Sequence, residues 1–587
     1  MVVSSMRRKK NRRRKLKKSV KLFLLLFLLV FVGSFFIYFS MNNKDSLIKI
    51  KSVKVYLASD NNIVSTMIKD DEDNYVKGED LIRGTEVITK NKIITYEDVK
   101  YNEVKYDDKV FYINTNNIAT DKKDVVKEKK MYVKIPSTAV NDINDIKIVF
   151  STSKGSELEV NGFDADDKDG NVLRYKVKYD DKEGYVDGKY LSFNLDDAKS
   201  NYNQEMYDNI YSKVNDNYGG GVAKELNFYP HEQVSFDDNV MPKSVYSLYL
   251  NCGSEVINNI DSYIEFAKST KINTFVVDIK DNETPAYPAD TFKNLSPSNY
   301  DKAINSYEKY KEAIDKLKNA GFYVVGRITT FKDSLYVNDH PEVAILNTNT
   351  GKPYYHNGSY WPSAYNRDVW YYTVSLAKES VEKFGFNEIN FDYVRFPDRM
   401  QSVSSIVDLK NTYNESKIQA IERFVRYATD ELHRLHVYVS IDVFGETSNG
   451  TYTTAYGQYW PSISNAADVI SGMPYPDHFA NYSYGIASPW NNPYKLLNAW
   501  GRNVMDRQKE TISPAKVRTW IQAYDVMSYV DSNGINYNAS EVQAEIKALF
   551  DASIKDGYIT WLANSNLNKY KAQKGAYDID YLEEYNG

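Results

Sequence analysis

Eight short apolar runs alternate with helix-forming stretches over residues 242–572, and this alternation limits the possible folds more than any other feature. The intervening stretches, such as Tyr307–Asn319 and Lys417–Leu435, repeat apolar residues at the helical period. Apolar strands separated by helices form parallel βα units, and eight units in about 330 residues predict a (β/α)₈ TIM barrel. The predicted strands are Val245–Leu250, Thr274–Ile279, Tyr323–Thr329, Glu388–Tyr393, Val437–Val443, Asp468–Met473, Val517–Gln522 and Tyr558–Leu562.

A doubly wound open sheet is the alternative for this region. That fold normally carries a glycine-rich phosphate-binding turn after its first strand, and residues 251–254 (Asn-Cys-Gly-Ser) do not match such a turn. The segment between the fifth and sixth predicted strands is also short of helical pattern. The barrel is therefore the expected fold.

Polar side chains follow seven of the eight predicted strands at their carboxyl ends, where barrel enzymes carry out their chemistry. A single aspartate at a strand end is commonly a helix cap or a turn residue. Capping alone does not explain polar groups at seven strand ends. The predicted substrate-binding residues are Asp278, Arg327, Arg395, Tyr475, Asp477, His478, Gln522 and Trp561.

Asp392 lies within an otherwise apolar strand, where an unpaired carboxylate would cost several kcal/mol. Arg395 or Arg327 would hold it ionised. Asp442 has the same setting on the next strand, and Glu446 follows on the loop. Neighbouring barrel strands separate such carboxylates by several ångströms, which suits glycoside hydrolysis, with about 5–5.5 Å for retention and more for inversion. Asp392 (nucleophile or stabiliser), Asp442 and Glu446 (acid) are the predicted catalytic residues; a structural Asp–Arg pair is the alternative.

All seven tryptophans lie after residue 360. Trp361, Trp460 and Trp490 stand beside prolines in predicted loops, where their rings could stack on sugar faces or could simply anchor the loops. Trp370 and Trp520 are predicted to lie in the core.

Several motifs resemble a family of bacterial proteins with a glycoside hydrolase-like barrel, over about residues 242–572. The resemblance implies a (β/α)₈ glycosidase-like domain whose activity was assigned by similarity. It supports Asp392 and Asp442 as rim carboxylates without settling which one attacks. Ile441 and Asp477 depart from the usual Ala and small residue, and neither change removes a carboxylate. The matching segments are 391–397 (Phe-Asp-Tyr-Val-Arg-Phe-Pro), 440–445, 457–458, 473–478 (Met-Pro-Tyr-Pro-Asp-His), 493–494, 327–333 and 520–522.

Residues 46–120 and 131–195 show the short alternating runs of two small β-units. The hexapeptide Val-Lys-Tyr-Asp-Asp-Lys at 104–109 recurs identically at 177–182, which indicates an internal repeat. Each unit resembles a bacterial SH3-like barrel. A spacer is the favoured interpretation and cell-wall or peptide binding the alternative, with residues 196–241 as a linker to the large domain.

Residues 22–40 are predicted to form a transmembrane anchor behind a basic cytoplasmic tail, residues 1–21. Leu22–Phe39 carry no charge, and eighteen residues at 1.5 Å each are just long enough to cross a hydrocarbon core of about 30 Å. Eleven Lys and Arg residues precede the run, so the positive-inside rule places the N-terminus in the cytoplasm. A cleaved signal peptide is the alternative, but no small-residue cleavage site follows. The lipid bilayer is thus an expected partner, and the domains after residue 44 are expected outside the cytoplasm.

Charge and cysteine content exclude several classes of function. Outside the tail, 63 basic residues face 79 acidic ones for a net charge of −16, which gives no electrostatic basis for nucleic-acid binding. The single cysteine, Cys252, excludes a disulfide framework and a multi-cysteine metal site. The six histidines are scattered, which disfavours a metal-dependent carbohydrate deacetylase. No metal and no cofactor are expected.

Together these features predict a membrane-anchored, surface-exposed glycoside hydrolase acting on a polysaccharide or cell-wall glycan. The alternative is a barrel that binds glycan without turnover.

Overall fold

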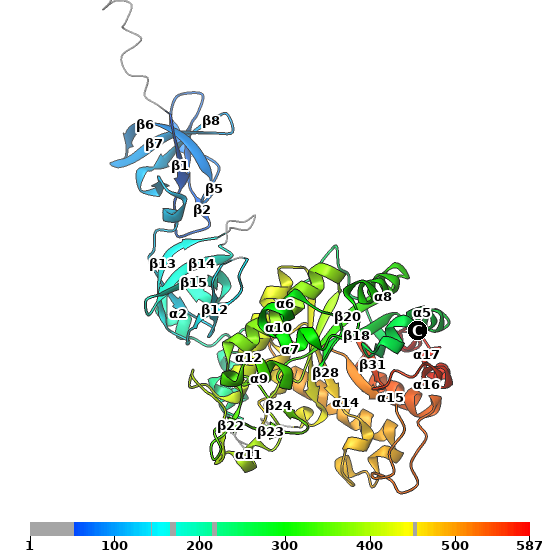
Figure 1. Ribbon diagram of the computed structural model, residues 1–587. Coiled ribbons are helices and arrows are strands. Elements are labelled where there is room, and N and C mark those ends of the chain that lie inside the picture. Colours follow the sequence, from blue (N-terminus) through cyan, green and yellow to red (C-terminus); the bar gives the residue numbers. More distant parts are fainter. Residues whose placement is uncertain (1–51, 143, 165–171, 214–219, 450–454, 587) are drawn as a thin grey trace, which may run out of the picture. The chain divides into compact units, whose positions relative to one another are not determined.

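The computed structural model describes residues 52–142, 144–164, 172–213, 220–449 and 455–586 (Figure 1). Among them, contacts divide the chain into two compact units, one reaching Lys127 and the other beginning at Glu128. The predicted tail and anchor, residues 1–40, lie outside the described residues. Within the described ranges, no helix has both the length and the apolar character needed to cross a bilayer.

The first unit is an antiparallel sheet with strand order β4-β3-β8-β7-β6-β1-β9. Its interior is closed by alternating apolar side chains such as Val55, Val104 and Phe111. A separate two-stranded ribbon joins β2 (Ile63–Val64) to β5 (Leu81–Ile82). The sheet strands are β1 (Val53–Leu57), β3 (Met67–Lys69), β4 (Tyr75–Lys77), β6 (Glu86–Tyr96), β7 (Val99–Tyr106), β8 (Lys109–Asn114) and β9 (Ile118–Ala119).

The second unit begins with another seven-stranded antiparallel sheet, in the order β12-β11-β15-β14-β13-β10-β16. Taken in chain order, its strands pair as those of the first sheet do, which is what an internal repeat predicts. The finer SH3-like assignment stays a prediction. The strands are β10 (Lys130–Val133), β11 (Thr138–Val140), β12 (Ile148–Ser151), β13 (Glu157–Phe163), β14 (Arg174–Tyr179), β15 (Lys182–Asp187) and β16 (Leu191–Ser192).

The repeated hexapeptide forms the same hairpin in both sheets. It spans the turn between β7 and β8 in one copy and between β14 and β15 in the other. The turn aspartates, Asp107–Asp108 and Asp180–Asp181, all have φ between 45° and 63°. A two-residue turn with positive φ at both positions is type I′, which matches the twist of the strands and accepts Asp. Sequence identity here therefore has a local structural cause.

The predicted barrel is present in the second unit. Eight parallel strands pair with their neighbours in chain order, and the last strand pairs back with the first, so the sheet is nearly closed. The seventh strand is interrupted at Arg518, whose NH1 reaches inward to Glu388 Oε1 at 2.6 Å. The strands are β17 (Val245–Leu250), β18 (Thr274–Asp281), β20 (Tyr323–Thr329), β25 (Glu388–Asp392), β27 (Tyr438–Phe444), β28 (Val469–Met473), β29 (Lys516–Val517) with β30 (Thr519–Gln522), and β31 (Gly557–Trp561).

Helices connect most of these strands and surround the barrel (Figure 1). The helix predicted at Tyr307–Asn319 is confirmed, and a capping box of Ser416 and Gln419 starts the helix predicted from Lys417. Between β27 and β28 the described residues contain the short 3-10 helix Gly445–Ser448 and the short α13 (Trp460–Ser464), in keeping with the weak helical pattern there. The longer helices are α5 (Ile260–Lys268), α8 (Tyr307–Asn319), α10 (Arg367–Phe384), α12 (Lys417–His433), α14 (Pro493–Lys509) and α15 (Ala539–Asp551).

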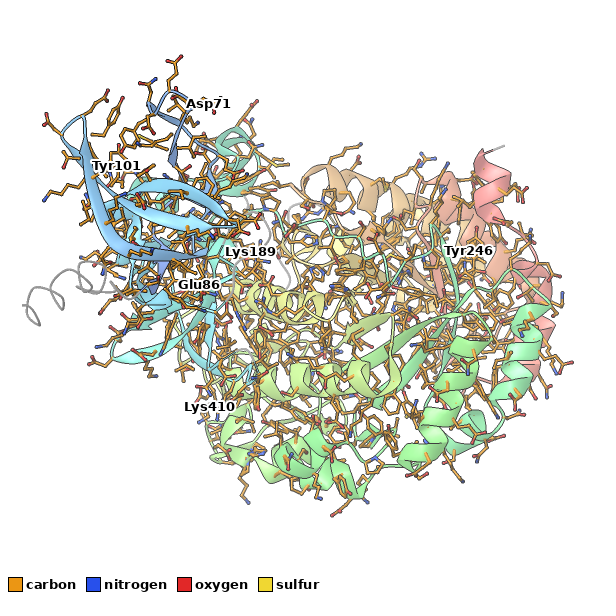
Figure 2. The ribbon with its side chains drawn as sticks, turned by 90° about the horizontal axis from the view of Figure 1, so that it is seen from above. Asp71, Glu86, Tyr101, Lys189, Tyr246 and Lys410 are labelled. Atoms are coloured by element: carbon orange, nitrogen blue, oxygen red, sulfur yellow. The ribbon has the colours of Figure 1, made fainter. Side chains whose placement is uncertain are left out.

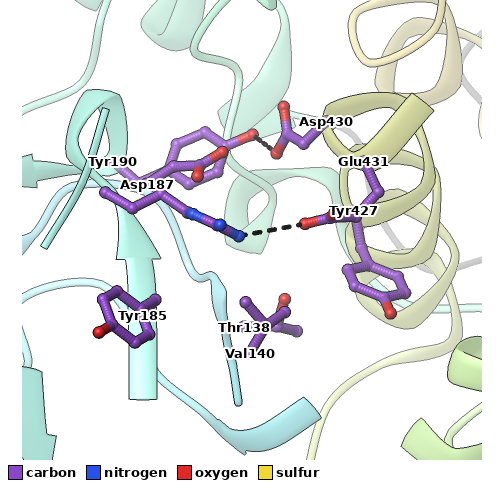
Figure 3. Close-up of a pocket in the computed structure, with 9 residues that line it drawn as sticks. Thr138, Val140, Tyr185, Asp187, Tyr190, Tyr427, Asp430 and Glu431 are labelled. Carbon is purple, nitrogen blue, oxygen red and sulfur yellow. Dashed lines mark hydrogen bonds and ion pairs between the residues drawn. The ribbon is translucent and has the colours of Figure 1, made fainter. Parts of the chain in front are cut away.

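The second β-sheet meets the barrel at helix α12 through a set of charges that we call the junction cluster. Lys189, labelled in Figure 2, has its Nζ 2.5 Å from Asp430 Oδ1, and the Tyr190 hydroxyl donates to the same carboxylate (Figure 3). Burial acts to raise the pKa of Asp430, but Lys189 and Tyr190 outweigh it and hold that pKa below its usual range. The junction cluster comprises Asp164, Arg174, Asp187, Lys189, Tyr190, Asp430, Glu431 and Arg434.

The junction cluster surrounds a cavity of about 20 Å³ (Figure 3). Such a volume holds one water molecule and no sugar. Arg174 and Glu431 line it, with NH1 and Oε1 3.9 Å apart. The second sheet is therefore more than a tether, because its charges are built into the same compact unit as the barrel.

Candidate functional site

A pocket of about 220 Å³ lies at the carboxyl ends of the barrel strands. Seven strands or their following loops contribute to its wall, as the polar residues at the strand ends indicated. Six of the predicted site residues line it: Asp392, Arg327, Arg395, Tyr475, His478 and Trp561. The remaining lining residues are Asp281, Asn282, Tyr393, Phe444, Met473 and Trp520.

Arg327 holds Asp392 in place. Its NH2 donates to Asp392 Oδ2 at 2.6 Å, and its NH1 donates to Asp278 Oδ1 at 2.7 Å and Asp281 Oδ1 at 3.2 Å. The other oxygen of Asp392 accepts from the backbone N–H of Tyr393 at 2.6 Å. One buried guanidinium thus contacts three carboxylates, two of which line the pocket. Arg327, rather than Arg395, is the partner of Asp392.

The backbone is strained immediately beside Asp392. Tyr393, directly after β25, has a φ of 54°, and Asn282, directly after β18, has a φ of 47°. For a bulky residue such as tyrosine this conformation costs on the order of 1–3 kcal/mol, and such strain gathers at binding and catalytic sites. The bend brings both Asp392 and the Tyr393 ring to the pocket.

Asp278 lies behind the pocket rather than on its wall. It is fully buried and accepts hydrogen bonds from Arg327 and from the Tyr249 hydroxyl. Burial raises its pKa to about 7 against the opposing charge of Arg327. The predicted substrate contact is therefore replaced by a contact to Arg327, since β18 presents Asp281 to the pocket instead.

Asp442 is likewise sealed beneath the wall. Its Oδ1 accepts from Asn390 Nδ2 and from Trp520 Nε1, each at 2.8 Å, and its Oδ2 is buried without a hydrogen-bond partner. Burial and the neighbouring charge of Asp392 raise the pKa of Asp442 well above the usual range for a carboxyl group. The register of β25 and β27 puts it level with Asp392 as predicted, but the Trp520 ring covers it.

The other predicted rim residues lie away from the pocket wall. Glu446 is exposed on the loop after β27, and partial desolvation followed by the charge of Asp398 raises its pKa. Gln522 accepts from the Asp477 backbone N–H and donates to the Tyr524 carbonyl, and the Tyr524 hydroxyl donates to Asp477 at 2.7 Å. These last two predicted contacts brace the loops after β28 and β30 against each other instead.

Of the two roles left open for the three loop tryptophans, sugar stacking and loop anchoring, the structure supports loop anchoring. Trp361, Trp460 and Trp490 are buried, and each indole N–H donates to a protein acceptor about 3 Å away. The aromatic wall comes instead from Trp520 and Trp561, at the ends of β30 and β31. Trp520 was expected in the core, and it is almost fully buried while one side still faces the pocket.

Sequence reasoning missed several lining residues that were within reach of it. Asp281 and Tyr393 both lie at strand ends. Asp281 is three residues after the predicted site residue Asp278, and Tyr393 directly follows Asp392. Their position along the strand could have identified them as rim residues. That position separates the rim from the barrel interior only once the end of the strand is known. Across the described part of the chain, no group of three or more His, Cys, Asp or Glu side chains is arranged to hold a metal ion.

Residues 245–570, more than half of the chain, match a family model described as “Putative glycosyl hydrolase domain”. Among solved structures, the chain is similar to a hypothetical protein from Ruminiclostridium thermocellum ATCC 27405, at 30% identity over 33% of this chain and 97% of that one, with a TM-score of 0.28. It is also similar to the PgaB (BpsB) glycoside hydrolase domain from Bordetella bronchiseptica, at 12% identity over 57% and 98% of the two chains, with a TM-score of 0.42. The spore cortex-lytic enzyme SleL from Bacillus megaterium QM B1551 matches at 10% identity over 57% and 75%, with a TM-score of 0.35. At these TM-scores the structural likenesses carry no argument. No curated protein matches the chain.

Proposed function

Since the chain belongs to the family described as “Putative glycosyl hydrolase domain”, we propose that its barrel hydrolyses glycosidic bonds in a polysaccharide or cell-wall glycan. The observation that carries the proposal is the carboxylate of Asp392, which lines the pocket and is held by Arg327 and by the backbone N–H of Tyr393. A carboxylate placed there would either attack the anomeric carbon or stabilise the oxocarbenium-like transition state.

The proton for the leaving oxygen needs a second carboxyl group. Asp442 has a raised pKa but is buried behind Trp520, and Asp477 is held by Tyr524. Glu446 lies off the pocket wall, on the loop after β27, but it combines a raised pKa with exposure to solvent, so we propose it for the acid role. Asp442 would then be a positioning residue, which influences Asp392 from the neighbouring strand and does not touch the sugar. Trp561 and Tyr475 provide aromatic surface for the sugar ring.

A glycan-binding barrel without turnover is the second candidate. One observation favours it: Asp442, the predicted partner of Asp392, does not reach the pocket wall. Such a protein would bind sugar through the aromatic residues and the charges of the pocket and would release no product.

The two candidates are separated by incubating the purified full-length protein with a panel of purified cell-wall and capsular glycans. An enzyme releases new reducing ends from at least one glycan, loses that activity in D392N, and keeps it in D408N, which changes an exposed aspartate outside the pocket. Binding without product release by the wild-type protein would favour the second candidate.

We also propose that residues 22–40 anchor the chain in a lipid bilayer, with residues 1–21 in the cytoplasm and the two β-units and the barrel outside it. The uncharged run and the eleven preceding basic residues support this orientation. Protease added to intact cells should then digest the body and leave a small membrane-bound stub. A protected full-length chain would contradict the orientation.

A further inference from the structure

Arg395 is a buried cation on the pocket wall without a close carboxylate partner. Its side chain is 9% exposed, and NH1 donates to the backbone carbonyl of Phe396 at 3.1 Å. Within the described residues, the carboxylate that comes within 4.0 Å is Asp398, at that limit. Asp398 is already engaged by His356 Nε2 at 2.9 Å and Asn357 Nδ2 at 2.5 Å. The charge of Arg395 is therefore not matched by a direct ion pair.

Three aromatic rings fix the orientation of this guanidinium. Its central carbon lies 4.5 Å from the ring centroid of Phe444 and 5.0 Å from those of Trp361 and Tyr393. A guanidinium has five N–H donors, and the protein uses one of them here. The other nitrogens are not sealed in protein, so they open to the pocket that Arg395 lines. The three rings thus hold the Arg395 guanidinium in a fixed position at the pocket wall.

A second cation stands beside it. Lys332 Nζ lies 5.1 Å from the Tyr393 centroid, and no ion pair to Lys332 occurs among the residues that the structure describes. Desolvation, together with repulsion from Arg395, lowers the pKa of Lys332, while the charges of Glu283, Asp281 and Asp392 oppose the shift. Arg327, by contrast, has three carboxylates around it. Burying an unpaired charge is costly, so an unmatched pair of cations at a pocket indicates an anionic ligand.

We propose that Arg395 binds a carboxylate of the substrate, so that the barrel acts on an acidic glycan whose unit in the pocket is a uronic acid or a lactyl-substituted hexosamine. The inference rests on the proposed function, because it names the substrate class of the same pocket. A carboxylate can accept two parallel N–H bonds from a guanidinium. Asp281 and Asp392 share the pocket, which favours a singly charged group over a phosphate that carries up to two charges.

Recognition of this kind must act at short range. The chain outside its basic tail is strongly acidic, and salt screens its repulsion of an acidic glycan over about 8 Å under physiological conditions. The local cations therefore decide whether an acidic sugar unit is accepted.

The test measures binding of small sugar acids to the purified full-length protein by tryptophan fluorescence at pH 7.5. Trp361 contacts Arg395, and Trp520 and Trp561 line the pocket, so occupancy should alter emission. Glucuronate, galacturonate and N-acetylmuramate are compared with glucose, galactose and N-acetylglucosamine, with glucose 6-phosphate as the phosphate probe. We expect at least one acid to bind about tenfold or more tightly than its neutral parent.

Variants assign that preference to Arg395. R395Q should bind acid and neutral sugar equally, R395K should keep part of the preference, and R399Q, an exposed arginine outside the pocket, should keep all of it. Circular dichroism checks the fold of each variant. Should R395Q fail to fold, two measurements still test the proposal: the comparison of each acid with its neutral parent on the wild-type protein, and the same comparison on R395K.

Three results would overturn the proposal: no acid preferred by the wild-type protein, a preference that survives in R395Q, or tighter binding of glucose 6-phosphate than of any sugar carboxylate. Because no step of this test requires hydrolysis, it is separate from the test of the enzyme. Preference for sugar acids without cleavage of any glycan would refute the proposed activity and leave the assignment of Arg395 intact.

Discussion

The junction cluster and the rim pocket both contain buried charged side chains, but the two regions differ in how these charges are paired. At the junction, Lys189 faces Asp430 and Arg434 faces Asp187, and the space left between the elements holds about 20 Å³. At the rim, Arg327 takes three carboxylates while Arg395 has no close one, and about 220 Å³ stays open. Ion pairs across the junction hold two parts of a fold together, although Arg174 and Glu431 there keep buried atoms without hydrogen-bond partners. Unmatched charges beside an open space indicate a ligand.

The sharpest test of this difference is Asp392→Asn at the rim. Glycan hydrolysis should fall by at least about 10³-fold, because the ionised carboxylate is lost from the reacting centre. Thermal unfolding should shift little, since Asn can still accept from Arg327. Product release and melting curves measure the two effects. A large loss of stability with activity retained would show that Asp392 supports the fold and does not take part in catalysis.

The next largest effect is the pH dependence that Asp278 confers. Its pKa is about 7 in the folded chain, above the value of about 3.9 expected when unfolded. Between roughly pH 4 and 7 the native state therefore keeps a proton that the unfolded state has lost, and the contribution to stability falls as pH rises. Linkage gives about 1.4 kcal/mol per pH unit in that window for a full proton difference.

Asp278→Asn should remove this contribution. Urea unfolding of the wild-type protein and D278N is measured at pH 4.5, 5.5, 6.5 and 7.5. The free energy of unfolding of the wild-type protein minus that of D278N should fall as pH rises and then level off. Parallel curves would mean that Asp278 is ionised in the folded chain throughout.

At the junction, Asp430→Asn should cost stability and spare activity. The substitution removes the negative charge and one of the two carboxylate oxygens, which accept from Lys189 and from Tyr190 respectively. Because the Lys189 side chain is 43% exposed, water can replace part of the interaction, and about 2 kcal/mol is expected rather than the larger cost of a fully buried pair. Chemical denaturation and glycan release at matched folded concentration measure the two. Lost turnover at full stability would show that the junction acts on the site.

The smallest expected effect is that of Tyr190→Phe, which removes one hydroxyl from the junction. Losing its hydrogen bond to Asp430 should cost about 1 kcal/mol. Tyr185→Phe is the matched control, since Tyr185 lines the same cavity and packs on Arg174 through its ring. The control should be near neutral, and equal costs for the two variants would refute a specific role for the Tyr190 hydroxyl.

The barrel could be predicted because its signal is local. Alternating apolar strands and helical stretches identified eight strands, with boundaries within one or two residues in nearly every case. The repeated hexapeptide likewise encodes its own turn through two aspartates that accept positive φ. It was harder to predict which polar residues reach the rim, because on β18 the buried Asp278 and the pocket-lining Asp281 are only three residues apart.

By itself, the sequence determined the periodicities, and with them the strands, the helices and the set of polar groups at the strand ends. Tertiary structure alone decided which charges meet. Arg327 finds Asp278 and Asp392 at separations of 49 and 65 residues, and Lys189 finds Asp430 at a separation of 241. Periodicity is fixed by neighbours within a few positions, whereas the matching of a buried charge depends on side chains that only the closed barrel brings together. For that reason Asp442 and Asp392 look alike in the sequence, while in the fold one is sealed behind Trp520 and the other faces the pocket.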